Sequence, residues 1–322
     1  MLFRSLFIQG VLVGMPLSFC SILVPVQAQQ KESEWQLQSL QGKVKIIEEK
    51  EYAATLQTAS IQGEKTDFSS YIDTGTGVVS HQWTQFTRKG HIAEEKFFDE
   101  KARVTARTVY KYNEMGDLTE MVEYNERGKK SGKTLYTYNS NRQFATETVF
   151  LSDGSMESAV YYYNTSHLLD SVVWKTPQGT RVEANRYNAR KQIVEKFYFE
   201  NRHLKEKRTF TFQLEGDLLL EEAYWNGNGT LDHRFTYSYD AHRQLTAVTK
   251  WDKAGKMESI NSWEYDAYGN ITSDTWRNEL GETVSLVRYL YRYDEQHNWV
   301  WQMSLDENQR PNSIMERVLT YY

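Results

Sequence analysis

The side chains able to take part in acid–base chemistry are numerous, but they form no catalytic pattern. The 322 residues include 43 aspartates and glutamates and seven histidines. A glycosidase needs two carboxyl groups flanking one sugar ring, and the sequence singles out no such pair. It also lacks the His-Glu-x-x-His, phosphate-loop, Gly-x-Ser-x-Gly and dinucleotide motifs. We therefore predict no catalytic residue, no metal site and no cofactor.

Aromatic side chains are the second group with a possible binding role, because 14% of the residues are aromatic. Exposed aromatic surface can bind a sugar or a peptide, whereas buried rings simply build the core. Trp225, Trp299 and Trp301 are our candidate ligand-binding residues. The last two lie two positions apart, and Tyr293 already supplies the aromatic residue that their unit needs. Core packing is the competing interpretation for all three.

Stepping along the chain, aromatic residues mark a unit that recurs about every 25 residues. Most copies continue with Asn or Asp, four have glycine at the fourth position, and nine have an apolar residue at the sixth. The repeat aromatic residues are Phe86, Tyr112, Tyr138, Tyr163, Tyr187, Phe212, Tyr239, Tyr265, Tyr293 and Tyr321. The sixth positions are Ile92, Leu118, Phe144, Leu169, Ile193, Leu218, Leu245, Ile271 and Trp299.

This spacing predicts a tight turn between two strands. Asp or Asn opens a turn by bonding the backbone ahead of it, and glycine adopts the left-handed conformation that closes a hairpin loop. Arg142, His167, Lys191, Arg243 and His297 replace that glycine. We expect those copies either to form a different loop or to absorb strain, which costs roughly 1–2 kcal/mol per residue.

Alternating aromatic residues before each turn predict strands with both rings on one face, as at Trp263 and Tyr265. A second turn follows each second strand. The predicted fold is all-β: a repetitive antiparallel meander of two-strand units over residues 83–322. So many strands cannot stay flat, so we expect the meander to curl or coil into an elongated sheet with aromatic residues on its concave face.

The segment Tyr265-Asp266-Ala267-Tyr268-Gly269-Asn270-Ile271 resembles the core of the YD repeat of Rhs-type proteins. The segments Leu40–Lys45 and Arg317–Tyr322 are also similar to the ends of small exported bacterial proteins with degenerate YD repeats. The resemblance implies a β-repeat fold. In large Rhs proteins such repeats form a shell around a toxin, and this much shorter array does not imply that role.

Residues 1–28 are predicted to be a signal peptide, with Arg4 before an apolar stretch and Val26-Gln27-Ala28 as the cleavage site. The alternatives are an uncleaved anchor and a lipoprotein modified at Cys20, the only cysteine. Cleavage would leave a cysteine-free chain with no membrane span. The net charge of −5 argues against a nucleic-acid partner, since such a partner requires a basic surface.

Residues 29–82 are predicted to form an N-terminal lead-in continuous with the array. A helical turn is expected near Trp35, Leu37 and Leu40, a strand from Gly42 to Tyr52, and a hairpin or loop at Tyr71–Gly77. At the other end, Arg317–Tyr322 has the pattern of a strand with no successor. It is expected either to pair within the curled sheet or to accept a partner's strand by β-augmentation.

These features favour a non-enzymatic, exported repeat protein: a binding or structural module of the periplasm or cell exterior. Its expected partner is an envelope or surface protein or a glycan. Two alternatives remain open. One is a carbohydrate-active enzyme with an unrecognised carboxylate pair, and the other is an assembly partner of a secretion or surface system.

Overall fold

The computed structural model describes residues 33–56 and 72–322 and contains one short helix and twenty strands. The predicted signal peptide lies outside the described residues. The elements are α1 (Glu34–Leu37), β1 (Val44–Leu56), β2 (Ile72–Phe86), β3 (Ile92–Phe98), β4 (Val104–Tyr112), β5 (Leu118–Asn125), β6 (Lys130–Tyr138), β7 (Phe144–Leu151), β8 (Met156–Tyr163), β9 (Leu169–Thr176), β10 (Gly179–Tyr187), β11 (Ile193–Glu200), β12 (His203–Phe212), β13 (Leu219–Asn226), β14 (Leu231–Tyr239), β15 (Leu245–Asp252), β16 (Met257–Tyr265), β17 (Ile271–Asn278), β18 (Thr283–Tyr293), β19 (Trp299–Leu305) and β20 (Pro311–Tyr321).

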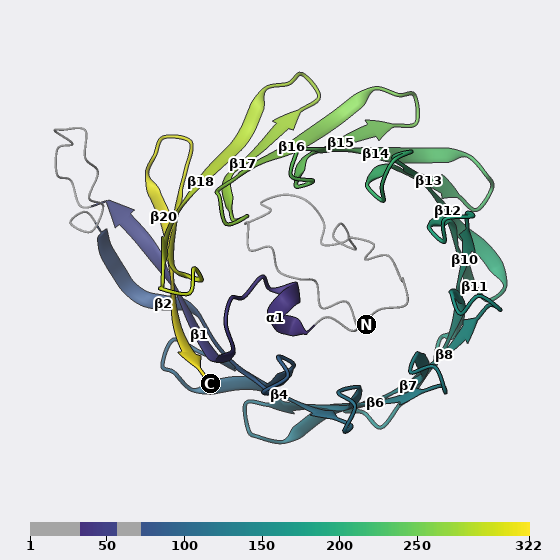
Figure 1. Cartoon of the computed structure of the whole chain (residues 1–322), viewed down its shortest axis with the longest axis horizontal. Coiled ribbons are helices and arrows are strands. Elements are labelled where there is room, and N and C mark those ends of the chain that lie inside the picture. The colour runs from purple at the N-terminus through teal and green to yellow at the C-terminus, as the bar shows by residue number, and fades with distance from the viewer. Residues whose placement is uncertain (1–32, 57–71) are drawn as a thin grey trace.

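The strands form a single closed antiparallel sheet. Each strand pairs with the next along the chain, and β20 pairs with β1, so the first and last strands meet (Figure 1). The all-β meander is therefore confirmed, but the expected elongated sheet is wrong, because the sheet closes on itself. Closure leaves no long row of unpaired backbone groups, which is the exposed feature of an open sheet.

The strand at the C-terminus shows how closure works. Pro311–Glu316 pair with β19, and Ser313–Tyr321 pair with β1. The Arg317 guanidinium lies 2.7 Å from Glu49 Oε1 and 3.3 Å from the ring centre of Trp299. Of the two outcomes expected for this strand, pairing within the sheet is the one observed, and β-augmentation is not.

The lead-in belongs to the same sheet. The helical turn at Trp35 is present as α1, and the strand predicted from Gly42 is β1. The hairpin or loop expected at Tyr71–Gly77 is wrong over most of its length, because β2 begins at Ile72 and pairs with the far end of β1.

The turn that follows each repeat aromatic residue, hereafter the repeat turn, has the predicted chemistry. In the reference copy, Asp266 Oδ1 accepts hydrogen bonds from the backbone N–H groups of Tyr268 and Asn270, at 2.8 and 2.9 Å. Gly269 has a φ of 85° and donates its N–H to Asp266 O. The turns at the other ends of the hairpins, hereafter the distal turns, use the same bonds, as at Asp252 and Asn278.

Copies without glycine keep this loop and absorb the strain. The five replacements all have a φ between 61° and 66°: Arg142, His167, Lys191, Arg243 and His297. Of the two outcomes left open by the sequence, the strained loop is the one observed. The cost of roughly 1–2 kcal/mol per residue is offset by the turn's hydrogen bonds and strand pairing.

The sixth position of the repeat pairs with the aromatic residue, as Tyr265 does with Ile271. One copy departs from this rule. Phe212 pairs with Leu219 rather than Leu218, because its turn is one residue longer and Gln213 N bonds Leu218 O. The expectation that Leu218 is the equivalent residue is therefore wrong.

The repeat tyrosines join consecutive units through their hydroxyl groups. Tyr265 donates to Leu245 O at 2.6 Å, and the same bond to the preceding unit recurs at Tyr112, Tyr138 and Tyr239. The last units are 28 residues long, and there Tyr291 makes the carbonyl bond. Tyr293 is thereby shifted onto Asp266, in the preceding repeat turn.

Strand pairing defines two faces around the whole sheet, because directly paired residues share a face. The repeat aromatic residues lie on the face against which Trp35 and Leu40 pack, beside Val44, Ile47 and Phe86. The helix α1 lies within the outline of the ring, among the repeat turns (Figure 1). This is therefore the inner face. The expectation of aromatic residues on a concave face holds for the repeat aromatic residues, whereas Trp251 and Trp301 lie on the outer face.

The outer face carries ion pairs and cations stacked on rings. Glu120 lies 2.7 Å from both Lys111 and Lys133, whose hydrogen bonds lower its pKa to about 2. Arg234 lies over the Trp251 ring, with its guanidinium 5.0 Å from the ring centre. Such long side chains cover the sheet with their alkyl stems and compensate in part for the lack of a second layer.

We predict that Tyr265→Phe lowers the free energy of unfolding by about 1 kcal/mol, because it leaves the Leu245 carbonyl without its hydroxyl donor. Thermal or urea unfolding followed by circular dichroism measures the change. Tyr162→Phe is the matched control, since Tyr162 is 50% exposed and its hydroxyl bonds no carbonyl among the described residues. Equal stability of both variants would contradict a stabilising role for the inter-unit bond.

Candidate functional site

The densest group of charges on the inner face surrounds Arg208 of β12. Its guanidinium carbon lies 4.8 Å from the ring centre of Tyr198 and 4.5 Å from that of Tyr224. Glu206 Oε1 lies 2.5 Å from Nε, and Glu222 Oε1 lies 3.5 Å from Nη1. Two carboxylates therefore converge here, as a glycosidase requires, but on a cation rather than on open space.

Electrostatics make this cluster a poor acid–base centre. Burial alone would lower the pKa of Arg208, but the neighbouring tyrosines and Glu206 hold it above its usual value. Glu206 and Glu222 both lie against one guanidinium, so these carboxylates face a cation rather than a space that a substrate could occupy. The arrangement is that of a half-buried ion cluster with two carboxylates and one guanidinium.

Two other inner-face carboxyl groups do have a raised pKa. Burial raises the pKa of Glu147, although the hydroxyl of Tyr161, 3.0 Å from Oε2, opposes the shift. Burial likewise raises that of Asp274, opposed by a hydrogen bond from Trp263. The two residues lie on β7 and β17 and do not form a pair. Neither has the second carboxylate that two-carboxylate glycoside hydrolysis uses.

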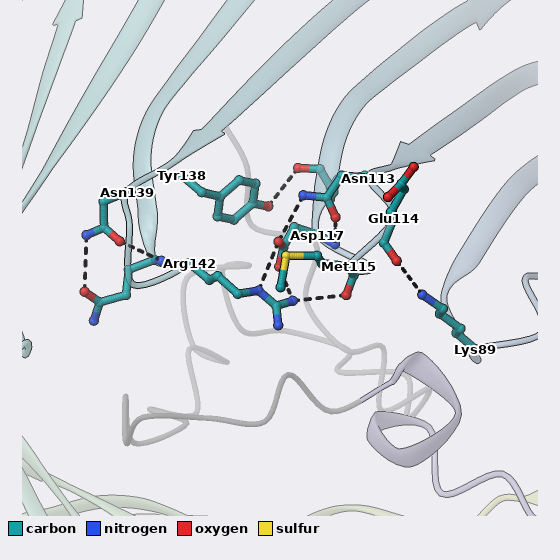
Figure 2. Close-up of polar contacts among 10 residues, drawn as sticks. Lys89, Asn113, Glu114, Met115, Asp117, Tyr138, Asn139 and Arg142 are labelled. Carbon is teal, nitrogen blue, oxygen red and sulfur yellow. Dashed lines mark hydrogen bonds and ion pairs between the residues drawn. The ribbon is translucent and has the colours of Figure 1, made fainter.

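The repeat turns form a belt on the inner side of the ring, and side chains link several of the turns to a neighbouring turn. Figure 2 shows one link: Arg142 reaches back to the preceding turn. It places Nη2 2.9 Å from Asp117 Oδ1 and 3.0 Å from Met115 O. Asp117 is only 2% exposed. The Arg142 guanidinium thus binds both carboxylate oxygens of Asp117, and this bidentate pairing fixes the spacing of the two turns.

Residues 33–43 of the chain itself lie against this belt. Asn298 in the last repeat turn exchanges two hydrogen bonds of 2.8 Å with the backbone N–H and C=O of Gln41. At the first repeat turn, the backbone N–H of Trp35 donates to Gly90 O, and Glu34 Oε2 lies 2.9 Å from His91 Nδ1. The belt can therefore bind a polypeptide backbone through side-chain amides and turn carbonyls.

The three tryptophans predicted to bind a ligand are half-buried and lie apart. Trp225 donates to Thr209 Oγ1 at 3.2 Å and has Lys207 over its ring. A bulge separates Trp299, which pairs with inner-face Tyr293, from Trp301, which pairs with outer-face Arg292. Trp299 and Trp301 thus lie on opposite faces and do not share one platform. Whether each ring binds a ligand stays a prediction.

The part of the chain that the structure describes contains neither a metal centre nor a spanning helix. Within residues 33–56 and 72–322, no three His, Cys, Asp or Glu side chains gather as a metal site. No helix in the same residues is long and apolar enough to cross a membrane.

Sequence reasoning missed both the Arg208 cluster and the seat of residues 33–43. The cluster comes from strands β11 to β13, and only the pairing register brings its members together. One signal was available: the fifth position of the repeat carries an amide in Gln143, Gln192, Gln244, Asn270 and Asn298. A recurring amide beside a turn indicates hydrogen bonding to neighbouring chain.

No family model and no curated protein matches the chain. Solved structures with a similar arrangement of strands include toxin chains. The TcdB2-TccC3-TEV crystal structure has 11% identity over 77% of this chain, with a TM-score of 0.37. The Photorhabdus luminescens Tc holotoxin pore has 12% identity over 77% of this chain, with a TM-score of 0.38. The chain spans 16% of the length of these toxin chains.

A porin-like protein from Bacteroides uniformis has 12% identity, with a TM-score of 0.32. The alignment covers 86% of this chain and 98% of the porin-like one. At these identities and scores, the likenesses define no activity for the chain.

We predict that Glu147→Gln stabilises the protein as pH rises above 4.5, the ordinary carboxyl value. A carboxyl group with a raised folded-state pKa stabilises the fold when protonated, and this contribution is lost as pH rises through that pKa. Glutamine keeps the contact with Tyr161 without ionising. Melting temperatures from pH 4 to pH 8 should therefore converge at low pH and separate at high pH. A constant difference would contradict the assigned burial.

Proposed function

We propose that the protein is an exported, non-enzymatic binding module that holds a polypeptide segment on the inner side of its closed sheet. One observation carries the proposal: the repeat turns already bind residues 33–43 through backbone groups. Asn298 is only 4% exposed. Its side-chain oxygen accepts from Gln41 N, and its side-chain nitrogen donates to Gln41 O and to the Tyr321 hydroxyl. Side chains that recognise backbone rather than particular residues suit an extended polypeptide ligand.

The enzyme alternative has less support. The carboxyl groups with a raised pKa, Glu147 and Asp274, are each engaged by one aromatic donor. The pair that converges, Glu206 and Glu222, lies against the guanidinium of Arg208 rather than against open space. Carbohydrate binding is favoured by the many rings, but Trp225, Trp299 and Trp301 each have a cation over the ring. A sugar would have to displace that cation.

Binding can be tested with the purified protein on two surfaces, an array of extended synthetic peptides and a glycan array. We expect retention of peptides, with no cleavage, and no retention of glycans. Peptide backbones with N-methylated amides are the control, because they cannot form the belt's hydrogen bonds. Glycan retention that is lost in Trp301→Ala would replace this proposal with carbohydrate binding. Release of a cleaved product would replace it with an enzyme.

Export is proposed from residues 1–28 alone. The expected result of N-terminal sequencing of the exported protein is a start at Gln29. A lipid-modified start at Cys20 would instead identify a lipoprotein, and an intact N-terminus would identify an anchor.

A further inference from the structure

The interface between β20 and β1 is the seam of the ring, because these two strands lie far apart in the sequence. Every other pair of neighbouring strands is consecutive in the chain. At the end of the seam that lies in the belt, Tyr321 pairs with Val44, as Tyr265 pairs with Ile271 in the reference copy of the repeat. The register skips one residue at the same place in both. The seam therefore ends in the register of a repeat turn.

The backbone at this end of the seam completes that turn. Tyr322 N donates to Lys43 O at 3.0 Å, and the corresponding bond in the reference copy is 2.9 Å long. Gly42 has a φ of 75°, against 85° for the reference glycine. Counted from Tyr321, Tyr322 is thus the first position, and residues 40–44 are the second to the sixth. The two segments together form a split repeat turn, hereafter the clasp.

The clasp lacks one part of an ordinary repeat turn, because Tyr322 stands where most copies have Asn or Asp. In the reference copy, that side chain accepts a hydrogen bond from the backbone N–H of the third position. Gln41 is the third residue of the clasp, and its N–H donates instead to Asn298 Oδ1 of the preceding turn, at 2.8 Å. Asn298 Nδ2 bonds both Gln41 O and the Tyr321 hydroxyl. Asn298 therefore joins the two segments of the clasp.

Glycine and two apolar residues fit the lead-in to this position. A Cβ atom on Gly42 would lie 3.3 Å from Tyr321 Cε1, so the backbone packs directly on the ring. Val44, the sixth residue, is fully buried, and Leu40 packs against the same core cluster, which contains Phe86. A side chain on Gly42 would meet the tyrosine and would also be strained by the left-handed conformation. The clasp therefore requires glycine at its fourth position.

We propose that the clasp is the device that holds the ring closed, and that its release converts the closed ring into an open sheet with every hairpin intact. Its two segments are not consecutive in the chain, so residues 40–44 can leave without disrupting a turn inside a hairpin. The seam would then be held only by the remaining strand pairs and by the ion pair of Arg317 with Glu49. It would separate from the belt end, where the pairing of Val44 with Tyr321 is lost first.

Hydrogen exchange of the backbone amides, followed by mass spectrometry, tests the clasp in the full chain. Gly42→Val should raise the exchange of the amides that pair β1 with β20 about tenfold, while the other strand pairs keep their protection. Gly269→Val is the matched control, because Gly269 has the same position and a left-handed φ in a turn within one hairpin. It should raise exchange in β16 and β17 and leave the seam protected.

Asn298→Ala is a milder variant, which decides the case if Gly42→Val does not fold. It removes the amide that joins the two segments and adds no backbone strain. Asn270→Ala is its control, since Asn270 bonds the Tyr293 hydroxyl as Asn298 bonds that of Tyr321 but makes no hydrogen bond to residues 33–43. Faster exchange at the seam in Asn298→Ala alone supports the clasp.

Two results would overturn the proposal. The first is seam exchange that is equal in Asn298→Ala and Asn270→Ala, or in folded Gly42→Val and Gly269→Val, because the seam would then be indifferent to the clasp. The second is a loss of protection over all strands at once in Asn298→Ala, because the ring would then open only by unfolding.

Discussion

A sheet one layer thick must hold its strands in register without a second layer to pack against, and here the hydroxyl groups of the repeat tyrosines supply that tie. Most of them reach across a strand to a carbonyl of the preceding unit, as Tyr265 does to Leu245, whereas Tyr293 and Tyr321 bond an aspartate of the preceding repeat turn. Folds usually bury one sheet face against another element, whereas here strands such as β11 and β15 have both faces half-buried. This hydroxyl–carbonyl bond explains why most copies of the repeat carry tyrosine rather than phenylalanine. Where phenylalanine replaces it, at Phe86, another segment covers the ring.

The strain stored in the repeat turns is tolerable for the same reason. Arg142 adopts a left-handed conformation that costs roughly 1–2 kcal/mol, yet its side chain then points back to the preceding turn and pairs with Asp117 (Figure 2). From the same turn, Gln143 bonds His167 O in the following turn. Arg142 therefore links neighbouring turns through a contact that glycine could not make. Local strain is exchanged for an inter-unit bond.

Much of the fold could be predicted because its determinants are local. The turn, the alternation and the apolar sixth position all fall within a few residues of Tyr265 and were correct. Closure could not be predicted, because it depends on β1 meeting β20 across nearly the whole chain. Single-residue irregularities also escaped prediction. The extra residue after Phe212 moved the pairing to Leu219, and the bulge after Tyr293 sent Trp299 and Trp301 to opposite faces. The Arg208 cluster depends on that register and was invisible for the same reason.

The pairing of β20 with β1 also changes how the repeats share stability. In an open repeat array, the end units have one neighbour and fray first, so unfolding spreads inward. Here the last strand, anchored by Arg317 and Glu49, has two neighbours like any other. Releasing any unit must break two interfaces, so the chain lacks a low-cost starting point for fraying. The twenty strands should therefore unfold with the cooperativity of a single small domain rather than as a series of units.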